Sequence, residues 1–159
     1  MKNSFLIGGL LALALTGCGT AQIRTGSSEQ EVQSALGPPA AIVPRPGGGT
    51  TWEYPRGPAG LQTFLTQFDA GGKFVSCRQV LTDDNLQKIT VGMPQDEVRA
   101  LVGPPWRKDA IKRKDETVWD YMYRDTWGYR VEYSVMFDAD GKVTSKASRR
   151  LDDQRDSTK

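Results

Sequence analysis

The clearest pattern in the chain is an alternation of apolar and largely polar residues between positions 119 and 137. A period of two is typical of β-strands that bury one face, and the interruption at Trp127 and Gly128 indicates a turn between two strands. The sequence therefore predicts an antiparallel hairpin with one aromatic and aliphatic face. The residues of that face are Trp119, Tyr121, Tyr123, Tyr129, Val131, Tyr133, Val135 and Phe137.

Upstream of this hairpin, residues 94–102 have the period of a helix. Val98, Leu101 and Val102 lie at i, i+3 and i+4, which places them on one helix face. Pro94 suits the first helical position, and Gly103 suits a left-handed cap at the end. A helix this short is unstable alone, so we expect it to cover the apolar face of the hairpin.

The same arrangement occurs earlier in the chain. Residues 23–39 match residues 89–105 at a shift of 66 positions, and Ser28 with Glu31 forms a capping box in place of the proline. The correspondence continues downstream, which indicates that one module occurs twice. Its later landmarks are Trp52, Glu53 and Tyr54 against Trp119, Asp120 and Tyr121, and Phe68–Lys73 against Phe137–Lys142.

These elements predict an α+β fold of two tandem modules, residues 23–82 and 83–150. A brief helix over residues 83–88 is expected at the start of the second module. Because the sequence between the modules has none of the composition of a flexible linker, we expect the modules to pack against each other.

The first module departs from simple alternation. Leu61 and Leu65 fall on the opposite strand parity from Phe64 and Phe68, so this sheet has apolar groups on both faces. We expect its second face to contact the second module or a partner outside the chain.

The N-terminal residues predict export and lipidation. In residues 1–17 the apolar run Phe5–Leu15 has the length of a signal-peptide core and is short for a membrane-spanning helix. Leu15-Thr16-Gly17-Cys18 resembles the lipobox of bacterial lipoproteins, which implies cleavage before Cys18 and a covalent diacylglycerol and acyl chain, such as palmitate, on that cysteine. The alternative is an ordinary signal peptide followed by an incidental cysteine.

The residues beside the cysteine and at the C-terminus complete the domain prediction. Gly19 stands where lipoproteins of the inner membrane typically carry Asp, so the resemblance implies the periplasmic side of the outer membrane. Residues 18–22 would be a lipidated tether, and the charged residues 151–159 a disordered tail. Cys77 is expected as a small residue on a strand, with an intermolecular disulfide as the alternative.

The composition limits the catalytic and metal-binding sites that the chain can form. The 159 residues contain 21 Lys and Arg, 19 Asp and Glu, and no His, so the commonest general base and metal ligand is absent. No hydrolase or redox motif occurs, and Asp138–Gly141 resembles a calcium loop without its twelfth ligand. We therefore expect no enzyme, no metal, no cofactor beyond the lipid on Cys18, and neither nucleic acid nor a small-molecule substrate as partner.

Three pieces of the second module together resemble the SmpA/OmlA (BamE-like) family of outer-membrane lipoproteins. They are Val-Gly-Met-x4-Val-x3-Val-Gly-x-Pro at 91–105, Trp119-x-Tyr121, and the hairpin 135–141. The resemblance implies that each module is a short helical pair packed on an antiparallel sheet of three or four strands. A tandem of such modules is similar to the β-lactamase inhibitor protein (BLIP) fold.

Two regions are candidates for contact with a partner or with lipid. The predicted loop 106–116 concentrates basic residues, which attract anionic head groups by about 1 kcal/mol each, unless it is simply a solvated mobile loop. Trp127 lies at a strand turn, where aromatic residues often act as anchors. The candidate residues are Arg107, Lys108, Lys112, Arg113, Lys114 and Trp127.

Two functions follow as hypotheses. By resemblance, the chain is a non-catalytic scaffold that assists outer-membrane protein assembly, with phospholipid and the β-barrel assembly (BAM) proteins as partners. The alternative is a lipid-anchored periplasmic inhibitor that binds an enzyme through the combined polar sheet faces of both modules.

Overall fold

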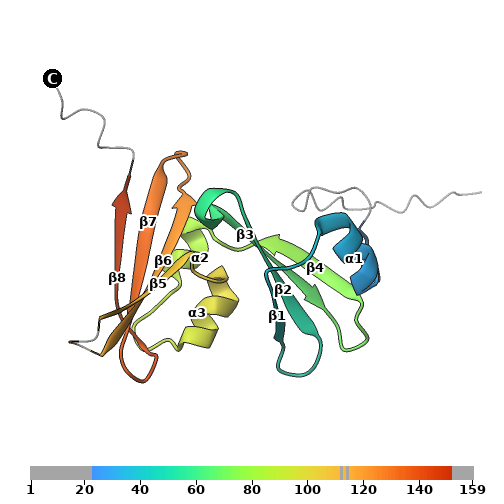
Figure 1. Ribbon diagram of the computed structural model, residues 1–159, viewed down its shortest axis with the longest axis horizontal. Helices are drawn as coiled ribbons and strands as arrows, with labels where there is room; N and C mark the ends of the chain where they lie inside the picture. The colour runs from blue at the N-terminus through green and yellow to red at the C-terminus, as the bar shows by residue number, and fades with distance from the viewer. Residues whose placement is uncertain (1–22, 112, 114, 152–159) are drawn as a thin grey trace, which may run out of the picture.

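The computed structural model describes residues 23–111, 113 and 115–151. In this part of the chain, eight strands form two antiparallel four-stranded sheets in which neighbours in sequence are neighbours in space (Figure 1). The first sheet contains β1 (Ala41–Pro44), β2 (Thr50–Arg56), β3 (Gln62–Phe68) and β4 (Phe74–Gln79). The second contains β5 (Arg107–Ile111), β6 (Glu116–Arg124), β7 (Arg130–Phe137) and β8 (Val143–Arg150).

Short helices lie between and beside these sheets. They are α1 (Glu29–Leu36), α2 (Asp83–Gln87), α3 (Gln95–Val102) and a 3-10 turn, η1 (Pro58–Gly60). Figure 1 shows four layers in the order α1, first sheet, α2 with α3, second sheet. The α+β arrangement in two modules is thus confirmed. The helical pair is formed by α2 and α3 in the second module, whereas the described residues of the first module contain one α-helix, α1.

Each module has its own apolar core. In the second module Val98 and Val102 of α3 are fully buried against the aromatic sheet face, and Leu101 packs at its side. In the first module Val32 of α1 packs on Trp52, Tyr54, Phe68 and Phe74. The predicted covering of each sheet by its helix is confirmed. No described helix is long and apolar enough to cross a membrane.

The duplication predicted from the sequence recurs in individual contacts. The Tyr54 hydroxyl donates a hydrogen bond to the Gly37 carbonyl at 3.2 Å, and Tyr121 donates to Gly103 at 3.4 Å. The ring centroids of the equivalent Trp–Phe pairs lie 4.6 Å and 4.9 Å apart. The two modules therefore share the same internal architecture, including the tyrosine that fixes the end of each helix to its sheet.

The second face of the first sheet is covered by α3 of the second module. Glu53 is 2% exposed there and accepts two hydrogen bonds from Arg99, Nε to Oε1 at 2.7 Å and Nη2 to Oε2 at 2.8 Å. Leu65 and Thr63 are buried on the same face. The expectation that this face contacts the second module is thus confirmed.

Gly103 brings α3 close to the first sheet. Its backbone has a φ of 85°, which favours glycine, and an added Cβ would lie 2.4 Å from Cγ2 of Thr63. The equivalent Gly37 has a φ of 83° but open space around it. The same residue therefore ends both helices, but only Gly103 also permits contact between the modules.

Four local predictions were wrong. Gly103 ends α3 with φ of 85° and ψ of −170°, which lies outside the left-handed helical region expected for its cap. Pro94 is the N-cap of α3, with ψ of 157°, so the helix begins one residue later at Gln95. Residues 107–111, predicted as part of a loop, form the edge strand β5. Tyr129 was placed in the core by parity, but it is 43% exposed because β7 begins only at Arg130.

We predict that Gly103→Ala destabilises the protein more than Gly37→Ala. Both variants force alanine into a backbone with positive φ and ψ near 180°, a region essentially confined to glycine, at about 1–3 kcal/mol. Only Gly103→Ala adds overpacking of about 1–3 kcal/mol against Thr63. Denaturant unfolding measures both losses. Adding Thr63→Ser, which removes the clashing methyl group, should recover part of the Gly103→Ala loss, whereas equal losses in both glycine variants would contradict the close packing.

We also predict that Arg99→Met costs about 3–5 kcal/mol of unfolding free energy, because it leaves the buried Glu53 carboxylate without its guanidinium. The double variant Glu53→Leu/Arg99→Met should lose clearly less than the sum of the single variants. Arg149→Met serves as the control, since its pair with Glu132 is solvated and such pairs contribute about 0–1 kcal/mol. Additive single losses in the cycle would show that the two residues are not coupled.

Candidate interaction site

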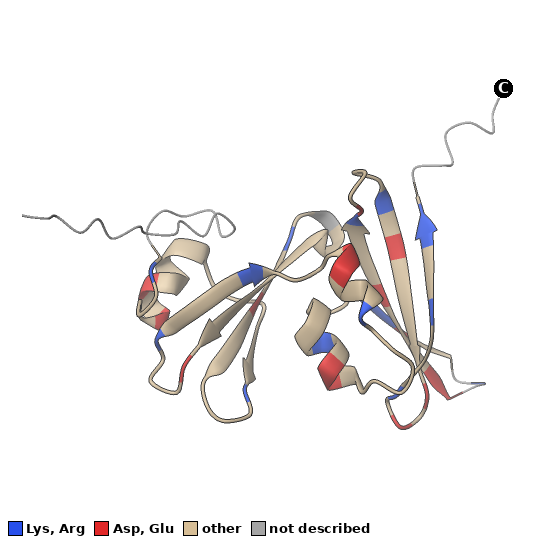
Figure 2. Ribbon diagram, turned by 180° about the vertical axis from the view of Figure 1, so that it is seen from behind, with Lys and Arg blue, Asp and Glu red and all other residues tan. Residues whose placement is uncertain are grey.

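The outer face of the second sheet is polar, and its charges are paired within the sheet. Arg107 donates to the buried Asp120 carboxylate at 2.6 Å and lies within 3.8 Å of Glu132, and Arg149 pairs with Glu132 at 2.7 Å. The hydrogen bond with Asp120 raises the pKa of the Arg107 guanidinium. Figure 2 shows Lys and Arg interspersed with Asp and Glu along the second sheet. This face therefore has no single strong sign of charge.

The three described residues of the predicted basic group, Arg107, Lys108 and Arg113, have different surroundings. Arg107 lies in the ion-pair network, while Lys108 places its Nζ 4.4 Å from the ring centroid of Trp119. Arg113 is exposed at the end of the β5–β6 hairpin. Lys112 and Lys114 lie outside the described residues, and so does Cys18.

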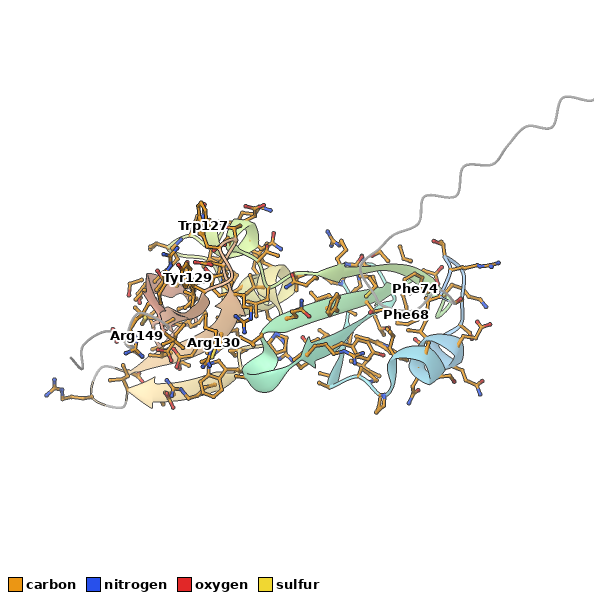
Figure 3. The ribbon with its side chains drawn as sticks, turned by 90° about the horizontal axis from the view of Figure 1, so that it is seen from above. Phe68, Phe74, Trp127, Tyr129, Arg130 and Arg149 are labelled. Atoms are coloured by element: carbon orange, nitrogen blue, oxygen red, sulfur yellow. The ribbon has the colours of Figure 1, made fainter. Side chains whose placement is uncertain are left out.

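Trp127 lies at the opposite end of the second sheet from that hairpin. The strand register pairs Ile111 with Glu116 at one end of β6 and Arg124 with Arg130 at the other. Residues 125–129 connect β6 to β7 beyond this second end, and we call them the β6–β7 tip. Trp127 is 78% exposed there and points away from the body of the molecule (Figure 3).

Two carboxylates hold the tip in one conformation. Asp125 accepts hydrogen bonds from the backbone N–H of Trp127 at 3.0 Å and of Tyr129 at 2.9 Å. Asp83 of α2 accepts from the backbone N–H of Thr126 at 3.1 Å and from the Tyr123 hydroxyl at 2.6 Å. Burial, together with the hydrogen bond to Asp83, raises the pKa of Tyr123. The indole is thus presented by an ordered turn, which lowers the entropic cost of binding through it.

Arginines from three strands surround the tip, and the alternating pattern of the sequence did not identify them as a group. Arg150 of β8 lies with its guanidinium carbon 4.8 Å from the ring centroid of Tyr129 and pairs with Asp125 at 2.9 Å. In Figure 3 Tyr129 lies between Trp127 and the positions of Arg130 and Arg149. The strand pairing of Arg124 with Arg130, and of Val131 with Arg150, brings these positions together. Only the register between strands reveals this cluster.

A cleft of about 400 Å³ lies between the modules. Its walls include the Glu53–Arg99 pair, Trp106, and Ala59 with Gly60 of η1. Within residues 23–111, 113 and 115–151, no three Cys, Asp or Glu side chains are grouped so as to hold a metal ion. Among the large apolar side chains of the described residues, Trp127 of the tip is the most exposed.

We predict that Asp83→Ala loosens the β6–β7 tip whereas Asp84→Ala does not. The first variant removes the acceptor for Tyr123 and Thr126 and should cost about 1–3 kcal/mol, while the exposed neighbour should cost less than about 0.5 kcal/mol. Native-state hydrogen exchange should show faster exchange of the Thr126 amide in Asp83→Ala alone. Unchanged exchange there would contradict the role of this carboxylate in holding the tip.

Comparison with solved structures gives distant similarities. A "putative beta-lactamase inhibitor protein" from Streptococcus mutans is 13% identical, with 78% of this chain and 83% of that chain aligned and a TM-score of 0.31. An extracellular protein containing an SCP domain from Bacillus anthracis is 14% identical, with 96% of this chain and 50% of that chain aligned and a TM-score of 0.32.

Comparison with protein families gives a definite match. No curated protein sequence matches the chain. Residues 79–147 match the family model described as "Outer membrane protein assembly factor BamE domain". This range covers α2, α3 and most of the second sheet, and it contains the 91–105 motif on which the SmpA/OmlA resemblance was based. The second module of this chain is therefore similar to the BamE domain over these residues.

Proposed function

We propose that the chain is a lipid-anchored lipoprotein on the periplasmic side of the outer membrane and acts as a non-catalytic scaffold in outer-membrane protein assembly. The observation that carries this proposal is the match of residues 79–147 to the BamE domain. The partners proposed are the proteins of the barrel-assembly machinery and outer-membrane phospholipid. The scaffold needs no cofactor other than the lipid.

The anchor is proposed from the sequence. Cys18 follows Leu15-Thr16-Gly17, and five residue steps separate it from Ile23, the first described residue. At about 3.3–3.6 Å per residue this tether would hold the first module within roughly 18 Å of the acyl chains. Two or more acyl chains give stable membrane anchoring, whereas one chain alone binds only marginally and reversibly.

The fold supports the scaffold better than it supports an inhibitor that binds an enzyme across both sheets. The inhibitor alternative needs the polar faces of both sheets to act together, but α3 covers that face of the first sheet and buries Glu53. The outer face of the second sheet is left as the free polar face among the described residues (Figure 1). A scaffold that presents separate surfaces to separate neighbours fits this arrangement better.

We predict that Cys18→Ala releases the protein from the membrane fraction and that Cys77→Ala does not. The comparison is needed because the sequence has two cysteines, Cys77 is not a free thiol, and a disulfide between Cys18 and Cys77 would compete with lipidation. Mass spectrometry of the mature N-terminal peptide should show diacylglycerol and an acyl chain on Cys18. A Cys18–Cys77 disulfide, or a Cys18→Ala variant that remains in the membrane, would contradict the anchor.

Purification from solubilised outer membranes tests the scaffold itself. Barrel-assembly proteins should copurify with the wild-type chain, and a loss mutant should show reduced levels of outer-membrane barrels and greater sensitivity to large antibiotics. Recovery of one soluble periplasmic enzyme would instead favour the inhibitor. Normal barrel levels with intact antibiotic resistance would count against the scaffold.

A further inference from the structure

We infer that the β6–β7 tip docks on a protein that offers an apolar pocket for Trp127 bordered by carboxylates. The inference names a contact surface for the proposed scaffold and rests on that function only for the choice of the first partner to test.

The equivalent turn of the first module contacts the second module of the same chain. This turn joins β2 to β3, contains η1, and packs against β6 of the second module. Ala59 and Gly60 of η1 share the walls of the cleft with Tyr121 and Met122 of β6. In the second module the corresponding turn is the β6–β7 tip, and no other described element covers its Trp127. The β2–β3 turn of the first module therefore packs against the second module, whereas the corresponding β6–β7 tip leaves Trp127 uncovered.

The tip has the composition of a single anchor. Trp127 is 78% exposed, while its neighbours Asp125, Thr126 and Gly128 are polar or small. Tyr129 is 43% exposed, and its ring is covered on one side by the Arg150 guanidinium. Insertion into a bilayer uses a broad apolar surface of several side chains. One indole on an ordered turn instead suits a pocket of similar size, and tryptophan is the residue type that most often dominates binding at protein interfaces.

The charge that a partner would meet around Trp127 is positive. The side chains of Arg149 and Arg150 are 67% and 44% exposed, whereas their partners Glu132 and Asp125 are 18% and 8% exposed. Arg124, at the end of β6 next to the tip, is also exposed. The carboxylates of these strands are thus shielded by their own arginines, so an acidic rim on the partner gives charge complementarity.

The first test introduces a photocrosslinking residue into the full-length chain in cells, at position 127 and, as a control, at position 91. Val91 is 72% exposed and lies outside the tip. Irradiation should join position 127, but not position 91, to one protein of the barrel-assembly machinery. An adduct to phospholipid or to a second copy of this chain would overturn the inference.

The second test measures binding of the purified crosslinked protein to the detergent-solubilised full-length chain. Trp127→Ser should weaken binding at least about tenfold, Val91→Ser should leave it unchanged, and rising salt should weaken the wild-type complex. Because the Trp127 side chain is exposed, both variants should keep the wild-type melting temperature. Undiminished binding by Trp127→Ser would overturn the inference, and so would Trp127-dependent binding to vesicles of phosphatidylglycerol and phosphatidylethanolamine.

The two proposals can fail separately. If the chain copurifies with the barrel-assembly proteins but Trp127→Ser binds them as well as the wild type does, the tip is not the docking site and the scaffold stands. If position 127 crosslinks to one protein outside that machinery and binding depends on Trp127, the docking inference stands and the proposed assembly role falls.

Discussion

The ion pair between Glu53 and Arg99 determines how the two halves of the chain are arranged. A carboxylate that is 2% exposed in the first sheet is costly unless a cation reaches it, and the cation comes from α3 of the second module. The same helix buries Val98 and Val102 against its own sheet. Since α3 is shared in this way, the two sheets must lie on opposite sides of it, and the four-layer order follows.

The duplication shows how the outer face of the second sheet differs from the face of the first sheet that α3 covers. In the first module Glu53 lies opposite Leu65 in the strand register, and in the second module Asp120, at the position of Glu53, lies opposite Ser134. Asp120 accepts a hydrogen bond from Arg107 of its own sheet, so it does not depend on a cation from a helix of another module. In the second module a serine thus replaces the leucine, and the cation comes from the same sheet. The outer face of the second sheet is therefore a solvated surface, like the polar outer face of a capping unit in a repeat array.

Much of this fold could be predicted because its information is local. The alternation around Tyr121, the helix pattern around Val98 and the repeated glycines each occupy a short stretch of sequence. What depends on pairing between distant residues could not be read in the same way. Glu53 and Arg99 are 46 positions apart, β5 is exposed at all five residues and so has no alternation of burial, and the arginines around the tip meet only through strand register. The parity of Leu65 is instructive, because it correctly indicated a second buried face without identifying what covers it.

The arrangement also limits where a partner can bind. The α3 helix covers one face of the first sheet and α1 covers the other, while on the outer face of the second sheet Arg107 is paired with Asp120. Broad sheet surfaces therefore have little unsatisfied chemistry to offer. The surfaces that remain for binding a partner are the turns at the ends of the strands, where side chains have no neighbour on an adjacent strand. Trp127 lies at such an end, on a turn that Asp83 and Asp125 hold by hydrogen bonds to its backbone. The most exposed of the large apolar side chains described is therefore carried by an ordered turn, which lowers the entropic cost of binding through it.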